Sequence, residues 1–202
     1  MIDEFSTISK NCRYDLKDKG SKFIGLSYKI ESNEEADEII KKNKKEYYDA
    51  THNCFAYRLG LDLNSFRYND DGEPSGTAGK PILNAIDQLS LTNVLVIVNR
   101  YFGGTKLGVP GLIRAYHDTA YETLKCSQIE KKIITKKLKL TFTHNLISNV
   151  MHILSIKGIQ IRDQIYDENV NLIIEVRLTS AEDFSKNIYE AMNGKIQIND
   201  FS

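Results

Sequence analysis

The sequence predicts an α+β protein built from two domains, and three observations lead to this prediction. A continuous apolar run at Val94–Val98 is typical of a strand covered on both faces. The polar stretch Gln128–Lys132 divides the chain, and a β-α-β-β-α-β order of elements begins at Thr135. We therefore predict one domain at residues 1–128 and a second at residues 132–202.

The strands and loops of the first domain have distinct signals. Lys22–Ile30 alternates well enough to predict a strand, and His52–Gly60 is predicted to be a second strand that ends at its glycine. Turn-forming residues predominate in Asn64–Lys80, which predicts a loop.

Three helices are predicted in the same domain. One begins after a cap at Ser32 or Asn33, with its acids early and its lysines late. Pro81 suits the first turn of a short second helix, and Pro110 suits the first position of a third. In the third helix one buried stripe is expected at Leu112, Tyr116, Ala120 and Leu124.

The second domain reads as a split βαβ arrangement. Its predicted elements are strand Thr135–Thr143, helix Asn145–Lys157, strand Ile159–Tyr166, strand Asn171–Leu178, helix Ala181–Met192 and strand Lys195–Ile198.

Composition restricts the function classes. The 202 residues carry 27 basic and 27 acidic side chains, so any nucleic-acid or membrane contact must come from a local patch. No apolar run approaches the roughly 20 residues of a membrane span, and the acidic N-terminus is unlike a signal peptide. The three cysteines (Cys12, Cys54 and Cys126) are odd in number and far apart, which predicts no disulfide and a reducing cytoplasm. Cys54 is expected to be a core thiol.

The stretch "RYFGGTKLGVPGLIRAY" is the first candidate site. A glycine-rich turn before a helix presents backbone N–H groups at the positive end of the helix dipole, where an anion can bind. The alternative is a tight turn with a purely structural role. The candidate anion-binding residues are Arg100, Gly103, Gly104, Lys106, Gly108 and Arg114.

The stretch "NDDGEPSGTAGKP" is the second candidate. Ser75, Gly76, Thr77 and Lys80 precede a helix and form a second candidate anion site. The acids here lack the ligand order of a calcium loop and are expected to shape a turn, so we predict no metal site. Further candidates for polar surface contacts are His52, Asn53, Asp71 and Glu73.

Four blocks of the sequence together resemble one family. They are "KGSKFIG", "DATHNCFAYR", "DDGEPSGTAGKPIL" and "VNRYFGGTKLGVPGLIRAY", and their order and spacing are similar to those of the IMPACT/YigZ family in its two-domain bacterial form. The resemblance implies an N-terminal ribosomal protein S5 domain 2-like sandwich, with a four-stranded sheet backed by two helices. It implies a C-terminal ferredoxin-like domain similar to the last domain of elongation factor G. Val109 and Pro110 stand where the family usually has Thr and Gly.

Two functions remain open at this point. The first is a non-catalytic cytoplasmic regulator that binds RNA, the ribosome or translation factors through the cations named above. The translation-type folds implied by the resemblance favour it, and zero net charge counts against it. The second is an enzyme or small-ligand protein that binds a phosphorylated metabolite or nucleotide between the two glycine-rich loops, which rests on fold analogy. The sequence assigns no catalytic residue and predicts no cofactor.

Overall fold

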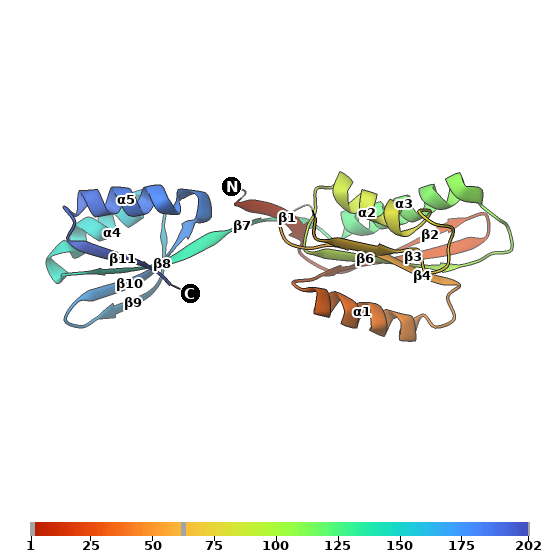
Figure 1. The fold of residues 1–202 in the computed structure, drawn as a ribbon, viewed down its shortest axis with the longest axis horizontal. Coiled ribbons are helices and arrows are strands. Elements are labelled where there is room, and N and C mark those ends of the chain that lie inside the picture. Colours follow the sequence, from red (N-terminus) through yellow and green to blue (C-terminus); the bar gives the residue numbers. More distant parts are fainter. Residues whose placement is uncertain (1–2, 62–63, 202) are drawn as a thin grey trace. The chain divides into compact units, whose positions relative to one another are not determined.

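The computed structural model describes residues 3–61 and 64–201, and the chain divides into two compact units (Figure 1). The N-terminal unit is Phe5–Lys132. The C-terminal unit consists of the chain from Ile133 onward together with Asp3 and Glu4. The outer ends of the two predicted domains, residues 1 and 202, lie outside the described residues.

The N-terminal unit contains a five-stranded sheet in which all neighbours are antiparallel. The predicted apolar strand lies at its centre, and every side chain from Val94 to Arg100 is buried. The prediction of a loop over Asn64–Lys80 was wrong at its start, because that segment contributes an edge strand. The strands in spatial order are β2 (Cys12–Asp18), β3 (Ser21–Lys29), β6 (Val94–Tyr101), β4 (His52–Arg58) and β5 (Phe66–Asn69).

Helices cover both faces of this sheet (Figure 1). On one face lie α2 (Gly79–Gln88) and α3 (Gly108–Cys126), and on the other lies α1 (Asn33–Glu46). The resemblance implies four strands and two helices. The N-terminal unit has one more strand in this sheet and one more helix, α1, on the opposite face. The predicted cap of α1 is confirmed, since the Ser32 side chain accepts from Glu35 N–H.

The two faces of the sheet each have an apolar core. The larger core lies under α2 and α3 and includes the whole predicted α3 stripe, Leu112, Tyr116, Ala120 and Leu124. The smaller core lies under α1 and includes Phe55, Tyr57 and Ile97. A separate two-stranded sheet pairs β1 (Glu4–Ile8) with β7 (Ile129–Ile133). Strand β7 covers most of the polar stretch Gln128–Lys132 at which the sequence predicts a domain boundary.

The C-terminal unit has the predicted β-α-β-β-α-β order. Its four-stranded sheet has the order β11-β8-β10-β9. Both helices lie on one face of this sheet, and one apolar core lies between the helices and the sheet (Figure 1). A bidentate ion pair joins Asp3 to Arg177 within this unit. The elements are β8 (Thr135–Phe142), a 3-10 turn (His144–Leu146), α4 (Ile147–Ile156), β9 (Gln160–Tyr166), β10 (Val170–Arg177), a second 3-10 turn (Leu178–Ser180), α5 (Ala181–Ala191) and β11 (Ile196–Asp200).

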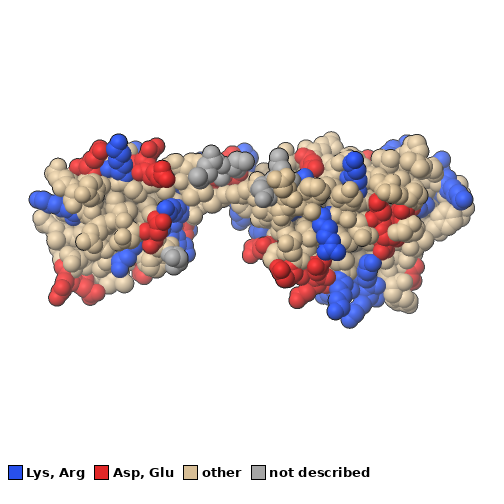
Figure 2. All heavy atoms as spheres, viewed as in Figure 1, with Lys and Arg blue, Asp and Glu red and all other residues tan. Residues whose placement is uncertain are grey.

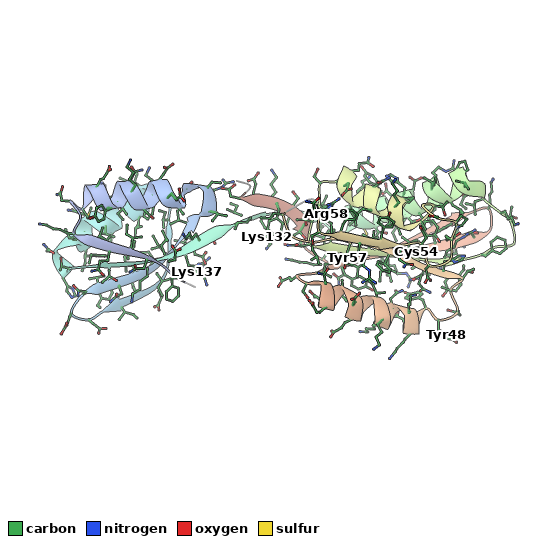
Figure 3. The ribbon with its side chains drawn as sticks, in the orientation of Figure 1. Tyr48, Cys54, Tyr57, Arg58, Lys132 and Lys137 are labelled. Atoms are coloured by element: carbon green, nitrogen blue, oxygen red, sulfur yellow. A yellow bond between two sulfur atoms is a disulfide. The ribbon has the colours of Figure 1, made fainter. Side chains whose placement is uncertain are left out.

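The prediction about the cysteines needs a correction, and the cysteines no longer support a reducing cytoplasm. Cys12 on β2 and Cys126 at the end of α3 form a disulfide, with their Cα atoms 6.0 Å apart. The two residues are 114 positions apart in the chain, and only the packing of α3 against β2 brings them together. Cys54 is the buried core thiol that the sequence predicts (Figure 3).

No helix among the described residues is long and apolar enough to cross a membrane.

Candidate functional site

A buried ion pair lies at one end of the N-terminal sheet. In the antiparallel register Arg100 on β6 lies between Phe23 on β3 and His52 on β4. Its guanidinium Nη1 lies 2.6 Å from Glu73 Oε1, and the two side chains are only 6% and 3% exposed. A charge pair removed from water to this degree persists only when further hydrogen bonds satisfy it.

Those further hydrogen bonds come from three parts of the fold. The Tyr116 hydroxyl on α3 donates to the same Glu73 oxygen at 2.8 Å, and Arg100 Nη2 donates to Ser21 Oγ at 3.3 Å. The guanidinium also lies over the rings of Phe23 and Phe102, each 5.5 Å away. Arg100 Nε has no hydrogen-bond partner among the described residues. We call Ser21, His52, Glu73, Arg100 and Tyr116 the buried polar cluster.

His52 forms the accessible margin of the buried polar cluster. Its Nδ1 lies 2.8 Å from the Asp71 carbonyl oxygen, which can only accept, so this nitrogen carries the proton. Its Nε2 is 3.8 Å from Glu73 Oε1, and the side chain is one-fifth exposed.

The Tyr116 hydroxyl of the cluster and the neighbouring Cys54 thiol both resist ionisation. Burial, and then the nearby Cys54 and Glu73, raise the pKa of Tyr116. Burial likewise raises the pKa of the Cys54 thiol, which lies 3.0 Å from the Asp70 carbonyl oxygen. Cys54 therefore stays a neutral thiol at ordinary pH, which makes it a poor nucleophile.

The second predicted anion site is filled by the chain itself. Asp70 Oδ1 accepts from the N–H groups of Ala78 and Gly79, and Oδ2 accepts from Gly76 N–H, at 2.8 to 3.0 Å. The first amides of α2 thus bind an internal carboxylate, which the sequence reading did not foresee. Of the other residues named there, Thr77 donates to the Pro74 carbonyl, while Ser75 and Lys80 are exposed.

The remaining acid of that loop is also used internally. Asp71 accepts from Asn53 N–H and from Lys44 Nζ, each at 2.7 Å. Asn53 itself accepts from Asn43 on α1. No group of three or more His, Cys, Asp or Glu side chains in the described part of the chain is arranged to hold a metal ion.

The glycine-rich turn has a structural role at Gly103 and exposes side chains to solvent at other positions. A Cβ on Gly103 would lie 1.9 Å from the Gly20 carbonyl carbon, so this glycine allows two backbones to touch. Phe102 and Lys106 are exposed beside it. Arg114 is also exposed and lies 3.4 Å from Asp18.

Both helix starts lie at the same end of the sheet as this turn. β6 ends at Tyr101, a few residues before α3, and a Cβ on Gly79, at the start of α2, would contact the Asn69 backbone. The start of α3 has no side-chain cap. We call residues 102–108 with the first turns of α2 and α3 the loop end. The predicted cations Lys80 and Lys106 lie on it, Arg114 lies on the next turn of α3, and Arg100 is internal.

A basic pocket of about 520 Å³ lies between α1 and β5. Its cations are Lys41, Lys44, Lys45 and Arg67. Figure 2 shows acidic side chains over the N-terminal half of α1 and basic ones over its C-terminal half. This pocket was not predicted from the sequence. The lysines at i, i+3 and i+4 were a visible signal, but Arg67 reaches them only through the unpredicted strand β5.

The fold and these sites define an α+β protein of two units, whose recognisable motifs converge on one end of its N-terminal sheet. Residues 19–124 match the Impact N-terminal domain, and residues 140–195 match a domain of unknown function (DUF1949). The protein belongs to the IMPACT family.

Curated relatives extend over nearly the whole chain. The IMPACT family member YvyE of Bacillus subtilis is 32% identical over 98% of this chain and 91% of its own length. An IMPACT family member of Haemophilus influenzae is 33% identical over 89% and 88%. A crystal structure of a hypothetical protein has the same fold, with a TM-score of 0.68, 24% identity and coverage of 100% and 99%.

Proposed function

We propose that this protein is a non-catalytic cytoplasmic regulator that binds RNA of the translation apparatus through its loop end. The observation that carries the proposal is the exposure of Phe102 and Lys106 beside the uncapped start of α3. A lysine there can neutralise a phosphate, and an exposed ring can stack on a base. Free backbone N–H groups can donate hydrogen bonds to an anion. Lys80 and Arg114 extend the same surface.

The finer fold assignment belongs to this proposal. The C-terminal sheet has its strands in the order fourth, first, third, second, which supports a ferredoxin-like domain. The layer of α2 and α3 on one sheet face supports the S5 domain 2-like assignment of the N-terminal domain. Both fold types resemble parts of translation proteins, and together they favour RNA over other polyanions.

Salt-dependent titration tests the proposal. Labelled single-stranded RNA is titrated against the wild type, Lys106→Ala and Lys42→Ala at several salt concentrations. Lys42 is the matched control, because it is an exposed lysine on α1, which covers the sheet face opposite α2 and α3. Lys106→Ala should reduce the slope of log affinity against log salt by about 0.7, the value of one lost phosphate contact. Equal slopes for all three proteins, or no RNA binding at any salt, would refute the proposal.

A second candidate function is the binding of a small phosphorylated molecule next to the buried polar cluster. One observation favours it: the buried guanidinium of Arg100 has one N–H group without a hydrogen-bond partner in the part of the chain that the structure describes, and Arg100 pairs across the sheet with the partly exposed His52. Calorimetric titration with a nucleoside triphosphate would separate the two. Saturable binding that is lost in His52→Ala and kept in Lys106→Ala would favour the small ligand.

A further inference from the structure

We propose that the outer edge of β5 binds an acidic, extended segment of a partner protein as an added strand. This surface adjoins the first turn of α2 at Asn69 but uses different residues from the loop end, and the inference does not depend on RNA binding. Three features of the N-terminal unit carry the inference: an unpaired strand edge, a basic pocket on one side of that strand, and an exposed aromatic pair on the other.

The edge is open in the described part of the chain, where β5 is the last strand of its sheet and pairs only with β4. Leu59 N–H donates to the Ser65 carbonyl at 2.9 Å, which fixes that position as a hydrogen-bonded pair. Antiparallel pairs alternate, so Arg67 and Asn69 face β4 with their backbone groups. The backbone N–H and C=O of Tyr68 and the C=O of Phe66 therefore point outward, where a new strand can pair.

The pocket beside β5 carries excess positive charge. Lys44 and Arg67 are neutralised by Asp71 and Asp37, at 2.7 and 2.8 Å. Lys41 and Lys45 also line the pocket, and neither forms an ion pair with another described residue. Two unneutralised lysines side by side favour carboxylates as the complement.

The opposite side of β5 is aromatic. The rings of Phe66 and Tyr68 are stacked in parallel with centroids 6.5 Å apart, and these residues are 44% and 41% exposed. Exposed strand edges normally carry charges that prevent pairing, whereas two aromatic rings beside an open edge promote cross-strand contacts. The single charge on the strand, Arg67, points into the basic pocket.

These features define the kind of partner. Successive side chains of an added strand point to opposite faces. A segment that alternates acidic and apolar residues would place its acids in the basic pocket and its apolar side chains against the aromatic pair. Recognition by strand addition uses the outward backbone groups, which an RNA strand does not match.

The probe for this proposal is a short fluorescent peptide in which Glu and Val alternate. Its control is a peptide of the same composition with Glu and Val in two blocks. The alternating peptide should bind measurably tighter. The double variant Lys41→Glu/Lys45→Glu should weaken its binding by at least about tenfold. Lys42→Glu should leave it unchanged, because Lys42 lies on α1 but does not line the pocket.

A backbone variant tests strand addition itself. Tyr68→Pro removes an outward N–H and leaves the pairing with β4 in place, since proline is tolerated on the solvent side of an edge strand. Tyr68→Ala removes the ring and keeps the N–H. Tyr68→Pro should bind the peptide more weakly than Tyr68→Ala. Unfolding transitions of both variants establish that each is folded in the binding assay.

Four outcomes would overturn the proposal. They are equal binding of the two peptides, equal effects of Lys42→Glu and of the pocket variant, equal binding by the two Tyr68 variants, and absence of saturable binding. Single-stranded RNA is the competitor: if it binds the wild type and loses affinity in the pocket variant while the peptide does not bind, this face binds RNA instead.

Discussion

Glu73 is the residue that holds the end of the N-terminal sheet together. One of its oxygens accepts from Arg100 on β6 and from Tyr116 on α3, so a single buried carboxylate joins the sheet to a helix. Removing either charge leaves the other unpaired while its side chain is more than nine-tenths buried. The cost of that isolated charge, rather than the strength of the pair, decides how substitutions behave here.

We expect Arg100→Met to lower the free energy of unfolding by about 3–5 kcal/mol, because Glu73 is then buried without its cation. Glu73→Gln/Arg100→Met should be more stable than Arg100→Met alone, since neither side chain then carries a charge. Chemical denaturation measures both values. A double variant that is less stable than the single variant would contradict this account.

Asp15 gives a pH-dependent prediction at the same scale. Its hydrogen bond to Arg13, followed by that to Lys22, lowers the pKa of Asp15 to about 2. A lowered carboxyl pKa stabilises the fold above the unfolded value near 4, and this contribution is lost as pH falls toward 2. The pair is exposed, so the effect stays below about 1 kcal/mol. Asp15→Asn should flatten the decline of stability between about pH 4 and pH 2; an unchanged decline would refute the assignment.

Side-chain roles were the least predictable part of the site. The sequence indicates that His52, Glu73 and Arg100 matter, and the structure brings these three together. The sequence does not reveal that Arg100 is internal, because its partner Glu73 is 27 positions away in the chain. The sequence predicts that the acids of this loop shape a turn, whereas the Asp70 carboxylate accepts from three backbone N–H groups just before and at the start of α2.

The glycine-rich turn is the element on which the proposed function depends. It has to let β6 pass into α3 and also present Phe102 and Lys106 to solvent. Gly103 meets the first need through its contact with Gly20, whereas Gly104 adopts a φ of +87° with open space around it. The two adjacent glycines therefore have different reasons to be glycine.

Alanine at these two positions should give different results. Gly104→Ala incurs only the strain of a left-handed backbone, about 1–2 kcal/mol. Gly103→Ala forces the turn at Gly20 to move, because the new Cβ meets backbone atoms, and should cost about 3 kcal/mol or more. Denaturation midpoints compare them. Equal losses for the two variants would show that the Gly20 contact does not constrain the turn.

Elements with a strong apolar signal were predictable, and edge elements were not. Val94–Val98 reads as a doubly covered strand, and β6 is buried almost throughout. β5 has only four residues, none of them buried, and it lies in a segment dominated by turn formers, so its short alternation of aromatic and polar residues was too weak to predict a strand. That failure concealed both the open edge and the basic pocket beside it.

At the scale of the whole molecule, the disulfide is the feature that links distant parts of the N-terminal unit. It closes a loop of 114 residues between the first long strand and the end of the last helix of that unit. The cysteine pattern could not reveal it, because the spacing matches no known framework and the pairing depends on how α3 packs.

Reducing this disulfide should destabilise the N-terminal unit by about 2–4 kcal/mol and leave the unfolding of the C-terminal unit unchanged. Denaturation of the wild type with and without reductant measures the difference. Cys12→Ser/Cys126→Ser is the control and should not respond to reductant. If oxidised and reduced wild type unfold at the same denaturant concentration, the link contributes nothing to stability.

The central claim is that the loop end contacts RNA. Ultraviolet cross-linking of the unmodified protein to uridine-containing single-stranded RNA, followed by mass spectrometry of the peptides, tests it most directly. We predict cross-links concentrated in residues 102–114, with Phe102 among them. Cross-links confined to the C-terminal unit or to the basic pocket of α1 and β5, or no cross-links at all, would contradict the account.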